Sequence, residues 1–366
     1  MNGQSLDELL NELRLQGDAP ADRLMAEIIE DGGSFLPVPA LLANKRTEEF
    51  IRQHSVLPNW ADLDKIARGQ ELFYRYGMTI VTLLFFSALP EGYACGNPAR
   101  VLAYTGKLNN DREVLKRILR TAQFIIDVME PGGLSAGGRG IESTLQIRLL
   151  HAAIRADLGR ANYSCEHGII NQEELAGTMN TFSILMLDGM KKYQHDFTEE
   201  EEEAYVHVWN VVGHIIGVDK RLLCDSPAEA RVLFHRIKTR IQSPCAESNE
   251  LTRALLNFLH EMIPGTLFDG FADTLMRHSI GDDLANRLNI ASSDWTENTI
   301  PLLRGLGYLS DTVGDHSELA QDVFQNLYRK LILGLLDFYK REPDNRSLHI
   351  KLSDELRERW AISQPT

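Results

Sequence analysis

Apolar side chains recur at intervals of three and four residues along most of this 366-residue chain. Two distant runs show the spacing clearly: Leu115, Ile118, Leu119, Ala122 and Ile126, and Phe324, Leu327, Leu331 and Leu335. One face of an α-helix collects positions i, i+3, i+4 and i+7, whereas a half-buried strand alternates every second residue. The pattern therefore predicts an all-α protein, most simply a single multi-helix globular domain.

Glycine and proline mark the places where these helices are expected to stop. They cluster at Pro37, Pro58 and within residues 90–92, 131–140 and 243–244. We divide the chain into an N-terminal helical or irregular segment (1–60), a core (61–245) and C-terminal helices that pack on the core (246–366). A surface loop is expected at residues 309–316. All the motifs described below lie in the core segment.

Charge and composition exclude several classes of partner. The net charge is −14, with 52 acidic against 38 basic residues, which disfavours nucleic acid and anionic membranes because both need clustered Lys and Arg. The longest apolar run covers only residues 78–89, whereas a membrane span needs roughly 20 residues. The N-terminus lacks the pattern of a secretory signal, and the four cysteines are scattered. We therefore expect no membrane span and a cytoplasmic protein.

The run of residues 146–155 predicts a helix with an unusual face. Arg148, His151 and Arg155 are spaced i, i+3 and i+7, so they project from the same side. Neutral imidazole is the commonest protein ligand for a transition metal, and Ala152 and Ala153 beside it would leave room for a flat molecule. The arginines could hold carboxylates of that molecule, as a porphyrin with two propionates requires. Alternatively, the histidine is an ordinary hydrogen-bonded residue and the arginines pair with acidic side chains of the protein.

Two further motifs are candidates for a pocket wall. Arg117, Arg120 and Thr121 share a face of a helix predicted over residues 111–128, where they could line a cavity or form a solvated stripe.

The second motif contains Trp209 and two histidines, His207 and His214. The histidines are seven residues apart, about 10 Å along a helix, so they cannot chelate one metal together. Gly213 and Gly217 indicate the close approach of another helix or of a flat ligand. Trp209 is equally a core residue or part of a pocket wall.

Other enzyme classes are not supported. The glycine-rich stretch 132–140 does not complete a dinucleotide-binding motif and is more simply a loop between helices. No histidine has a glutamate three residues away, which disfavours a helical di-iron site. A P-loop and an H-E-x-x-H motif are also missing from the sequence.

Taken in order, these motifs resemble a haem-dependent oxygenase family. The family includes bacterial rubber oxygenase (latex-clearing protein) and a fungal membrane-bound oxygenase of mycophenolic acid biosynthesis. The matching stretches are residues 105–108, 117–121, 148–155 (RLLHAAIR), 170–178 (INQEELAGT), 205–209 (YVHVW) and 213–218 (GHIIGV). Each stretch is degenerate alone, whereas the ordered set is fairly specific.

The resemblance implies a haem b (iron protoporphyrin IX) in a pocket between core helices. His151 would be the proximal iron ligand, and Arg148 and Arg155 would position it or bind the propionates. Trp209 and His214 would be further cofactor contacts.

By the same analogy, Arg117, Arg120 and Thr121 would stand over the distal face as catalytic residues. O₂ would be the co-substrate, and the substrate a hydrophobic isoprenoid- or lipid-like small molecule that is oxidised or cleaved.

The sequence departs from the family at the distal face. Arg120 stands where the family often has lysine, and a guanidinium cannot ligate iron. The family's distal glutamate has no clear match: Val101 falls near its place, and Glu91 and Glu113 are the nearest candidates. A non-oxygenase haem protein (sensor, carrier or peroxidase-like) and a cofactor-free helical binding module are the alternatives. Substrate identity and oligomeric state are left open.

Overall fold

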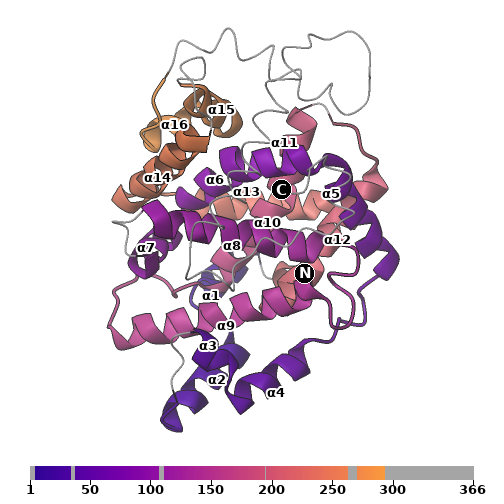
Figure 1. Cartoon of the computed structure of the whole chain (residues 1–366), viewed down its shortest axis with the longest axis vertical. Helices are drawn as coiled ribbons and strands as arrows, with labels where there is room; N and C mark the ends of the chain where they lie inside the picture. Colours follow the sequence, from indigo (N-terminus) through magenta and orange to yellow (C-terminus); the bar gives the residue numbers. More distant parts are fainter. Residues whose placement is uncertain (1–4, 34–37, 107–110, 194, 263–269, 293–366) are drawn as a thin grey trace, which may run out of the picture. The chain divides into compact units, whose positions relative to one another are not determined.

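The protein is described by a computed structural model covering residues 5–33, 38–106, 111–193, 195–262 and 270–292 (Figure 1). In these ranges the regular structure is helical, apart from one isolated antiparallel bridge between Cys95 and Gln242. This confirms the all-α prediction. The predicted loop at 309–316 and the apolar repeat at 324–335 lie outside the described residues.

The chain forms two units, each built from distant segments. The first comprises Met1–Gln70, Asp127–Ile184 and Glu200–Ile241, and the second comprises Glu71–Ile126, Leu185–Glu199 and Gln242–Thr366. The boundaries predicted after residues 60 and 245 instead divide the chain into consecutive segments. Those boundaries stay predictions. The two units are described separately below.

The first unit contains most of the helices that carry the predicted cofactor contacts. Its helices are α1 (Leu6–Leu13), α2 (Ala19–Glu30), α3 (Val38–Leu42), α4 (Lys45–His54), α9 (Arg139–Arg160), α10 (Gln172–Phe182), α12 (Glu199–Ile216, except its first residue), the 3₁₀ turn η2 (Lys220–Leu222) and α13 (Pro227–Ile241).

Local sequence explains where several of these helices begin. Ser5 and Asn171 each form a capping box with the glutamate three residues later, at the starts of α1 and α10. Asp18 caps α2 by accepting a hydrogen bond from the Ala21 backbone N–H, and a proline stands in the first turn of that helix, where a missing N–H is harmless.

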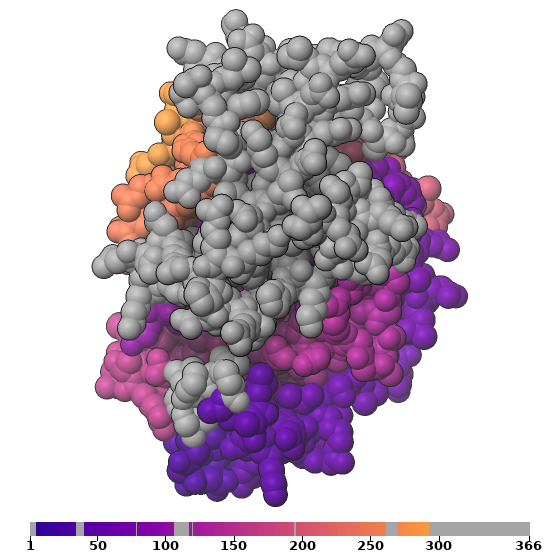
Figure 2. All heavy atoms as spheres, in the orientation of Figure 1, coloured from indigo at the N-terminus to yellow at the C-terminus, as the bar shows by residue number. Residues whose placement is uncertain are grey.

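Helices α2 and α4 pack on one face of α9 (Figure 1). The buried residues of this cluster are Ala21, Leu24, Met25, Ile28, Leu41, Phe50, Leu149, Ala152 and Ala153. In Figure 2 the purple residues of α2 and α4 adjoin the magenta residues of α9 on the same face of the molecule. Ala152 and Ala153 are fully buried there. The expectation that these small residues make room for a flat ligand is therefore wrong: they make room for α2.

The second unit is also helical where it is described. It contains most of α5 (Leu63–Leu83), the π-helical turn η1 (Leu84–Ala88), α6 (Leu89–Tyr93), α7 (Gly96–Gly106), most of α8 (Asp111–Met129), α11 (Ile184–Lys192, except its first residue), α14 (Ala246–Met262), α15 (Phe271–Ile280) and α16 (Asp282–Arg287).

The helix break predicted near 90–92 lies at residues 94–95, since α6 ends at Tyr93 and α7 begins at Gly96. Helices α5, η1 and α6 follow one another without a gap, and Pro90 stands in the first turn of α6. Proline is tolerated there because it fits the first helical turn. The break at 131–140 is confirmed, since α8 ends at Met129 and α9 begins at Arg139.

Within the described part of the chain, no single helix has the length and hydropathy to cross a bilayer. The segments Leu63–Gly77 and Thr79–Tyr93 meet that test only together, across a bend.

Candidate functional site

His151 lies in the middle of α9 with one ring nitrogen enclosed by protein. Its Nδ1 is buried and has no hydrogen-bond partner among the described residues. Burial and, to a smaller extent, the charge of Arg155 lower the pKa of His151 from 6.5 to about 4, although Asp18 partly opposes both effects. The imidazole is therefore neutral at pH 7, which is the protonation state that binds a metal.

The surroundings of His151 on α9 are apolar. Ile147, Leu150 and Ile154 lie on the same side of the helix and are half-buried, like His151 itself. The opposite side, with Leu149, packs in the core formed with α2. We call the side with His151 the histidine face. A buried ring nitrogen without a partner among the described residues is uncommon, and coordination of a metal ion would satisfy it. The face therefore fits an axial ligand beside a flat, hydrophobic group.

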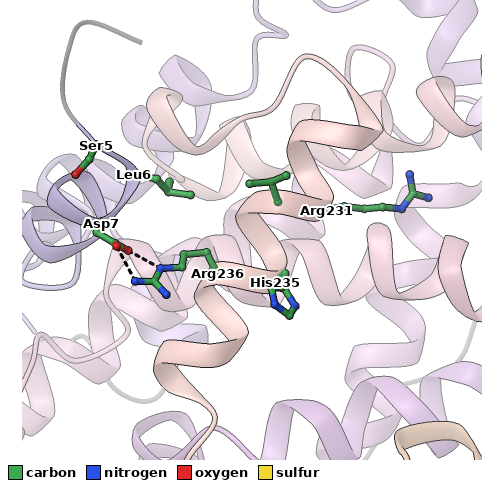
Figure 3. Close-up of a pocket in the computed structure, with 7 residues that line it drawn as sticks. Ser5, Leu6, Asp7, Arg231, His235 and Arg236 are labelled. Carbon is green, nitrogen blue, oxygen red and sulfur yellow. Dashed lines mark hydrogen bonds and ion pairs between the residues drawn. The ribbon is translucent and has the colours of Figure 1, made fainter.

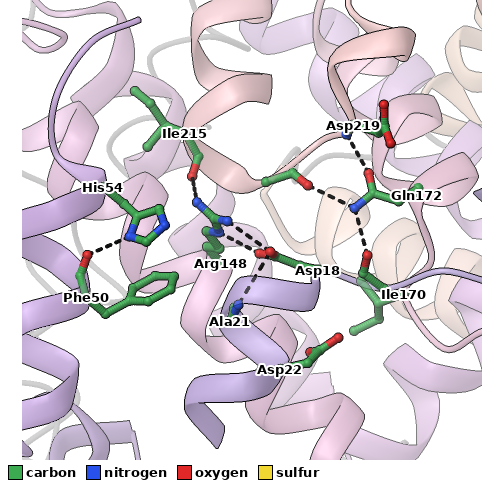
Figure 4. Close-up of polar contacts among 12 residues, drawn as sticks. Asp18, Ala21, Asp22, Phe50, His54, Arg148, Ile170, Gln172, Ile215 and Asp219 are labelled. Carbon is green, nitrogen blue, oxygen red and sulfur yellow. Dashed lines mark hydrogen bonds and ion pairs between the residues drawn. The ribbon is translucent and has the colours of Figure 1, made fainter.

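Arg148, one turn before His151, is held in a buried ion pair. Its Nε and Nη2 donate to the two carboxylate oxygens of Asp18, at 2.5 and 2.9 Å, and its Nη1 donates to the Ile215 carbonyl at 3.1 Å (Figure 4). Only 7% of the Arg148 side chain and 3% of the Asp18 side chain are exposed. The ring of Phe50 lies 5.2 Å from the guanidinium carbon. The Arg148 guanidinium therefore contacts a carboxylate, a backbone carbonyl and an aromatic ring.

Arg155, one turn after His151, is held in a similar way. It pairs with Asp22 at 2.7 Å and donates from Nη1 to the Ile170 carbonyl at 3.3 Å. Burial raises the pKa of Asp22, and the charge of Arg155 offsets this only partly. Both arginines therefore have carboxylate partners supplied by α2. Pairing with acidic side chains of the protein, the alternative given for these arginines, is therefore what the structure shows, and their roles toward a cofactor stay predictions.

Neighbouring backbone segments are tied to these ion pairs by Gln172. Its side-chain nitrogen donates to the carbonyls of Gly17 and Gly217, each at 2.9 Å, and its oxygen accepts from the Asp219 backbone N–H at 2.7 Å. The two glycines also make room for the ion pairs. A Cβ on Gly17 would lie 2.6 Å from an Asp22 oxygen, and one on Gly217 would lie 2.4 Å from an Asp18 oxygen.

The sequence pattern indicates a special role for Gly217 but not for the carboxylates beside it. Asp18 and Asp22 are four residues apart around the start of α2, so they project from the same side of that helix. Asp18, followed by a proline two residues later, is a recognisable helix start. Its pairing with a residue 130 positions away is not a local signal.

Trp209 is a packed core residue on α12. It is 2% exposed, and its ring stacks on Phe182 of α10 with centroids 5.3 Å apart. Gly213, one turn later, would place a Cβ 2.3 Å from the sulfur of Met179, also on α10. The sequence predicts that Gly213 allows the close approach of another helix or of a flat ligand. The structure shows the approach of a helix, α10. The role of Trp209 as a cofactor contact stays a prediction.

The two histidines of α12 lie beside an exposed tryptophan, Trp60. The Trp60 ring makes edge contacts with His207 and His214, with centroids 5.7 and 5.9 Å apart. His207 accepts a hydrogen bond at Nε2 from the Asp62 backbone N–H at 2.9 Å. Burial lowers the pKa of His214, and the charges of Arg148 and His54 lower it further. His214 is thus largely neutral at pH 7, and its role as a cofactor contact stays a prediction.

The predicted catalytic residues Arg117, Arg120 and Thr121 lie on α8 in the second unit. Arg117 donates to the Leu102 carbonyl of α7 at 2.9 Å, and Thr121 donates to the Arg117 carbonyl of its own helix at 3.0 Å. Arg120 is exposed. Burial raises the pKa of Tyr93 to about 12, and the charge of Arg117 opposes this rise. Their catalytic roles stay predictions.

Of the acidic residues considered as a distal base, Glu91 lies within the described part of the second unit. It is buried, and its carboxylate accepts a hydrogen bond from the Gln242 side chain at 2.6 Å. The side chain of Glu113 lies outside the described residues.

A surface hollow of about 470 Å³ lies between α1 and α13 of the first unit (Figure 3). It is lined by Ser5, Leu6, Asp7, Arg231, Val232, His235 and Arg236. Arg236 is already paired with Asp7, at 2.5 and 2.6 Å. None of the predicted site residues lines this hollow, so it does not extend the candidate site.

Comparison with known proteins identifies the class. The family described as "ER-bound oxygenase mpaB/B'/Rubber oxygenase, catalytic domain" matches residues 74–311. The chain therefore belongs to this oxygenase family, and the resemblance seen in the sequence is confirmed. His151 and the other predicted site residues lie within the match, whereas Asp18 and Asp22 precede it.

Individual relatives agree with this assignment. A rubber oxygenase of Streptomyces sp. (strain K30) is 23% identical over 301 residues, which cover 77% of this chain and 73% of the relative. A solved structure of latex clearing protein in the closed state matches with a TM-score of 0.76 at 20% identity, covering 87% of this chain and 91% of that one. At this identity the structural likeness establishes the fold alone.

Proposed function

We propose that this chain is a haem b-dependent oxygenase that uses O₂ to oxidise or cleave a hydrophobic, isoprenoid- or lipid-like small molecule. Membership of the oxygenase family supports the reaction class. The observation that carries the haem assignment is His151, a neutral imidazole with a buried, unpartnered nitrogen on an apolar face of α9.

The residues of the first unit have distinct tasks in this proposal. When bound, the haem iron supplies the centre at which O₂ is activated. His151 holds the iron through its neutral ring. Arg148 and Arg155 hold α9 in place through their ion pairs with α2. Ile147, Leu150 and Ile154 exclude water around the ligand and provide an apolar surface for the porphyrin.

The substrate class is proposed from two observations. The curated relative is named a rubber oxygenase, and the histidine face carries the apolar side chains of Ile147, Leu150 and Ile154 beside His151. Arg117, Arg120 and Thr121 are proposed as catalytic residues from the family resemblance. Arg120 is the exposed member of this set, so its substitution is the least damaging to the fold.

An absorption spectrum of the purified protein tests the haem assignment. The wild-type protein should show a Soret band as isolated or after addition of hemin, and His151→Ala should lose it while keeping its helical content. His235→Ala is the matched control, because His235 is an exposed histidine of the same unit. A wild-type protein that takes up no hemin would refute the assignment.

The oxygenase reaction needs a second measurement. The haem-loaded wild-type protein should consume O₂ and form carbonyl or hydroxylated products from isoprenoid or unsaturated lipid substrates. A haem-loaded protein that turns over none of them would favour the alternative of a haem sensor or carrier in the same fold.

A further inference from the structure

Residues at the start of α2 form ion pairs with α9 on both sides of the candidate ligand His151. Asp18, at the start of α2, pairs with Arg148 one turn before the histidine, and Asp22, in the first turn, pairs with Arg155 one turn after it. The carboxylates stand four residues apart and the arginines seven, so the long guanidinium side chains converge on the start of one helix. Neither pair involves the histidine itself.

These pairs fix both the rotation of α9 and its position along its axis. Arg148 and Arg155 also donate to the carbonyls of Ile215 and Ile170, so each guanidinium is anchored at two points outside α9. A rotation of α9 by 20° would move the tip of a long side chain by roughly 2 Å. Such a rotation would break both pairs.

The backbone around the pairs is adapted to them. Gly17 and Gly217 each bring a backbone atom so close that a Cβ would collide with Asp22 and Asp18, respectively. Gln172 ties the segments that carry these two glycines to each other through the Gly17 and Gly217 carbonyls. The arrangement therefore depends on contacts from four separate segments of the first unit.

We propose that Asp18 and Asp22 are positioning residues for the metal ligand: through Arg148 and Arg155 they hold His151 in the orientation that binds the haem iron. This inference rests on the proposed function. It assigns a role to a helix that precedes the segment matched by the family, residues 74–311. Residues that orient a metal ligand without touching the metal commonly change metal affinity by about 10–100-fold when they are mutated.

The test compares haem-loaded Asp18→Asn and Asp22→Asn with a matched control. Asp31→Asn removes a carboxylate from the other end of α2, where Asp31 pairs with Arg46 and is 56% exposed. The first measurement is the rate at which haem passes to excess apomyoglobin. The second is the iron–histidine stretching band of the reduced protein, which reports how the imidazole is held. Loss of stability alone lowers the unfolding midpoint but leaves this band unchanged in the folded molecules.

We expect haem loss to accelerate by about tenfold or more in Asp18→Asn and by less in Asp22→Asn, whose carboxylate is 38% exposed. The iron–histidine band should shift or broaden in both variants. Asp31→Asn should stay within about twofold of wild type, because exposed ion pairs contribute little. Asp22→Glu should restore the slow rate, since it keeps the charge at a partly exposed position.

The outcomes separate the two proposals. If the wild-type protein takes up no haem, the proposed function fails and this inference fails with it. If the wild-type protein holds haem but Asp18→Asn and Asp22→Asn leave both the rate and the band unchanged, the inference alone is overturned. Should Asp18→Asn not fold, Asp22→Asn and its rescue by Asp22→Glu decide the question.

Discussion

Replacing Gly217 by alanine should destabilise the first unit far more than the same change at another glycine of similar backbone conformation. Gly217 has φ of +92°, in the left-handed region that favours glycine. An alanine there costs roughly 1–2 kcal/mol from the backbone alone. Its Cβ would also lie 2.4 Å from Oδ2 of Asp18 and 2.9 Å from Nε of Arg148.

The collision of the new Cβ with Asp18 and Arg148 adds a second, larger loss of stability. The two side chains it displaces form a buried ion pair, and breaking such a pair costs roughly 3–5 kcal/mol. Because the pair can adjust partly, we expect a total loss of about 4–6 kcal/mol for Gly217→Ala. Gly137→Ala is the matched control in the same unit: its φ is +76°, and a Cβ there would meet nothing within 4 Å. Gly137→Ala should therefore lose only the roughly 1–2 kcal/mol of stability that comes from the backbone conformation.

Urea unfolding followed by circular dichroism measures both variants. A double-mutant cycle with Asp18→Ala sharpens the test, because removal of the carboxylate also removes the shortest of the close contacts made by the new Cβ. Gly217→Ala should therefore cost much less in the Asp18→Ala background than in the wild type. Equal destabilisation by Gly217→Ala and Gly137→Ala, or strict additivity in the cycle, would contradict the structure at this point.

Three further predictions concern other residues. Gln172→Ala should cost about 1–3 kcal/mol in urea unfolding, because two carbonyls and one N–H lose their partner; a loss below 0.5 kcal/mol, on the order of a surface substitution, would contradict it. Burial lowers the pKa of His207 below 6.5, so its contribution to stability is complete above pH 6.5 and declines as the pH falls. His207→Gln should flatten this decline, and an unchanged pH profile would contradict the assignment. Arg120→Ala should leave the Soret band intact but change O₂-dependent turnover; unchanged turnover would remove Arg120 from the catalytic residues.

Much of the fold could be predicted from the sequence because helix formation is encoded locally. The three-and-four spacing of apolar residues gave the all-α class, and the helix predicted over 111–128 agrees with α8 (Asp111–Met129). A local sequence signal predicts less when the same residue type is compatible with two different structures. A proline such as Pro90 predicts a helix break, although proline also fits the first turn of a helix, where the structure has it.

The candidate site, too, could be predicted only in part from the sequence. Helical periodicity alone places Arg148, His151 and Arg155 on one side of α9, because 3.6 residues complete each turn. The same periodicity cannot say which surroundings each face meets. In the sequence, Ala152 and Ala153 indicate room for a flat ligand, whereas in the structure they pack against α2.

What the sequence by itself determined is the helical class and the order of side chains along each helix, since both depend on neighbours a few residues apart. Only the tertiary structure decided the partners of the two arginines. With 52 acidic residues in the chain, nothing local selects Asp18 and Asp22, which lie 130 and 133 positions before the arginines they bind. Their choice depends on the packing of α2 against α9, which buries Asp18 and Arg148 together, so that each charge offsets part of what the other loses on leaving water.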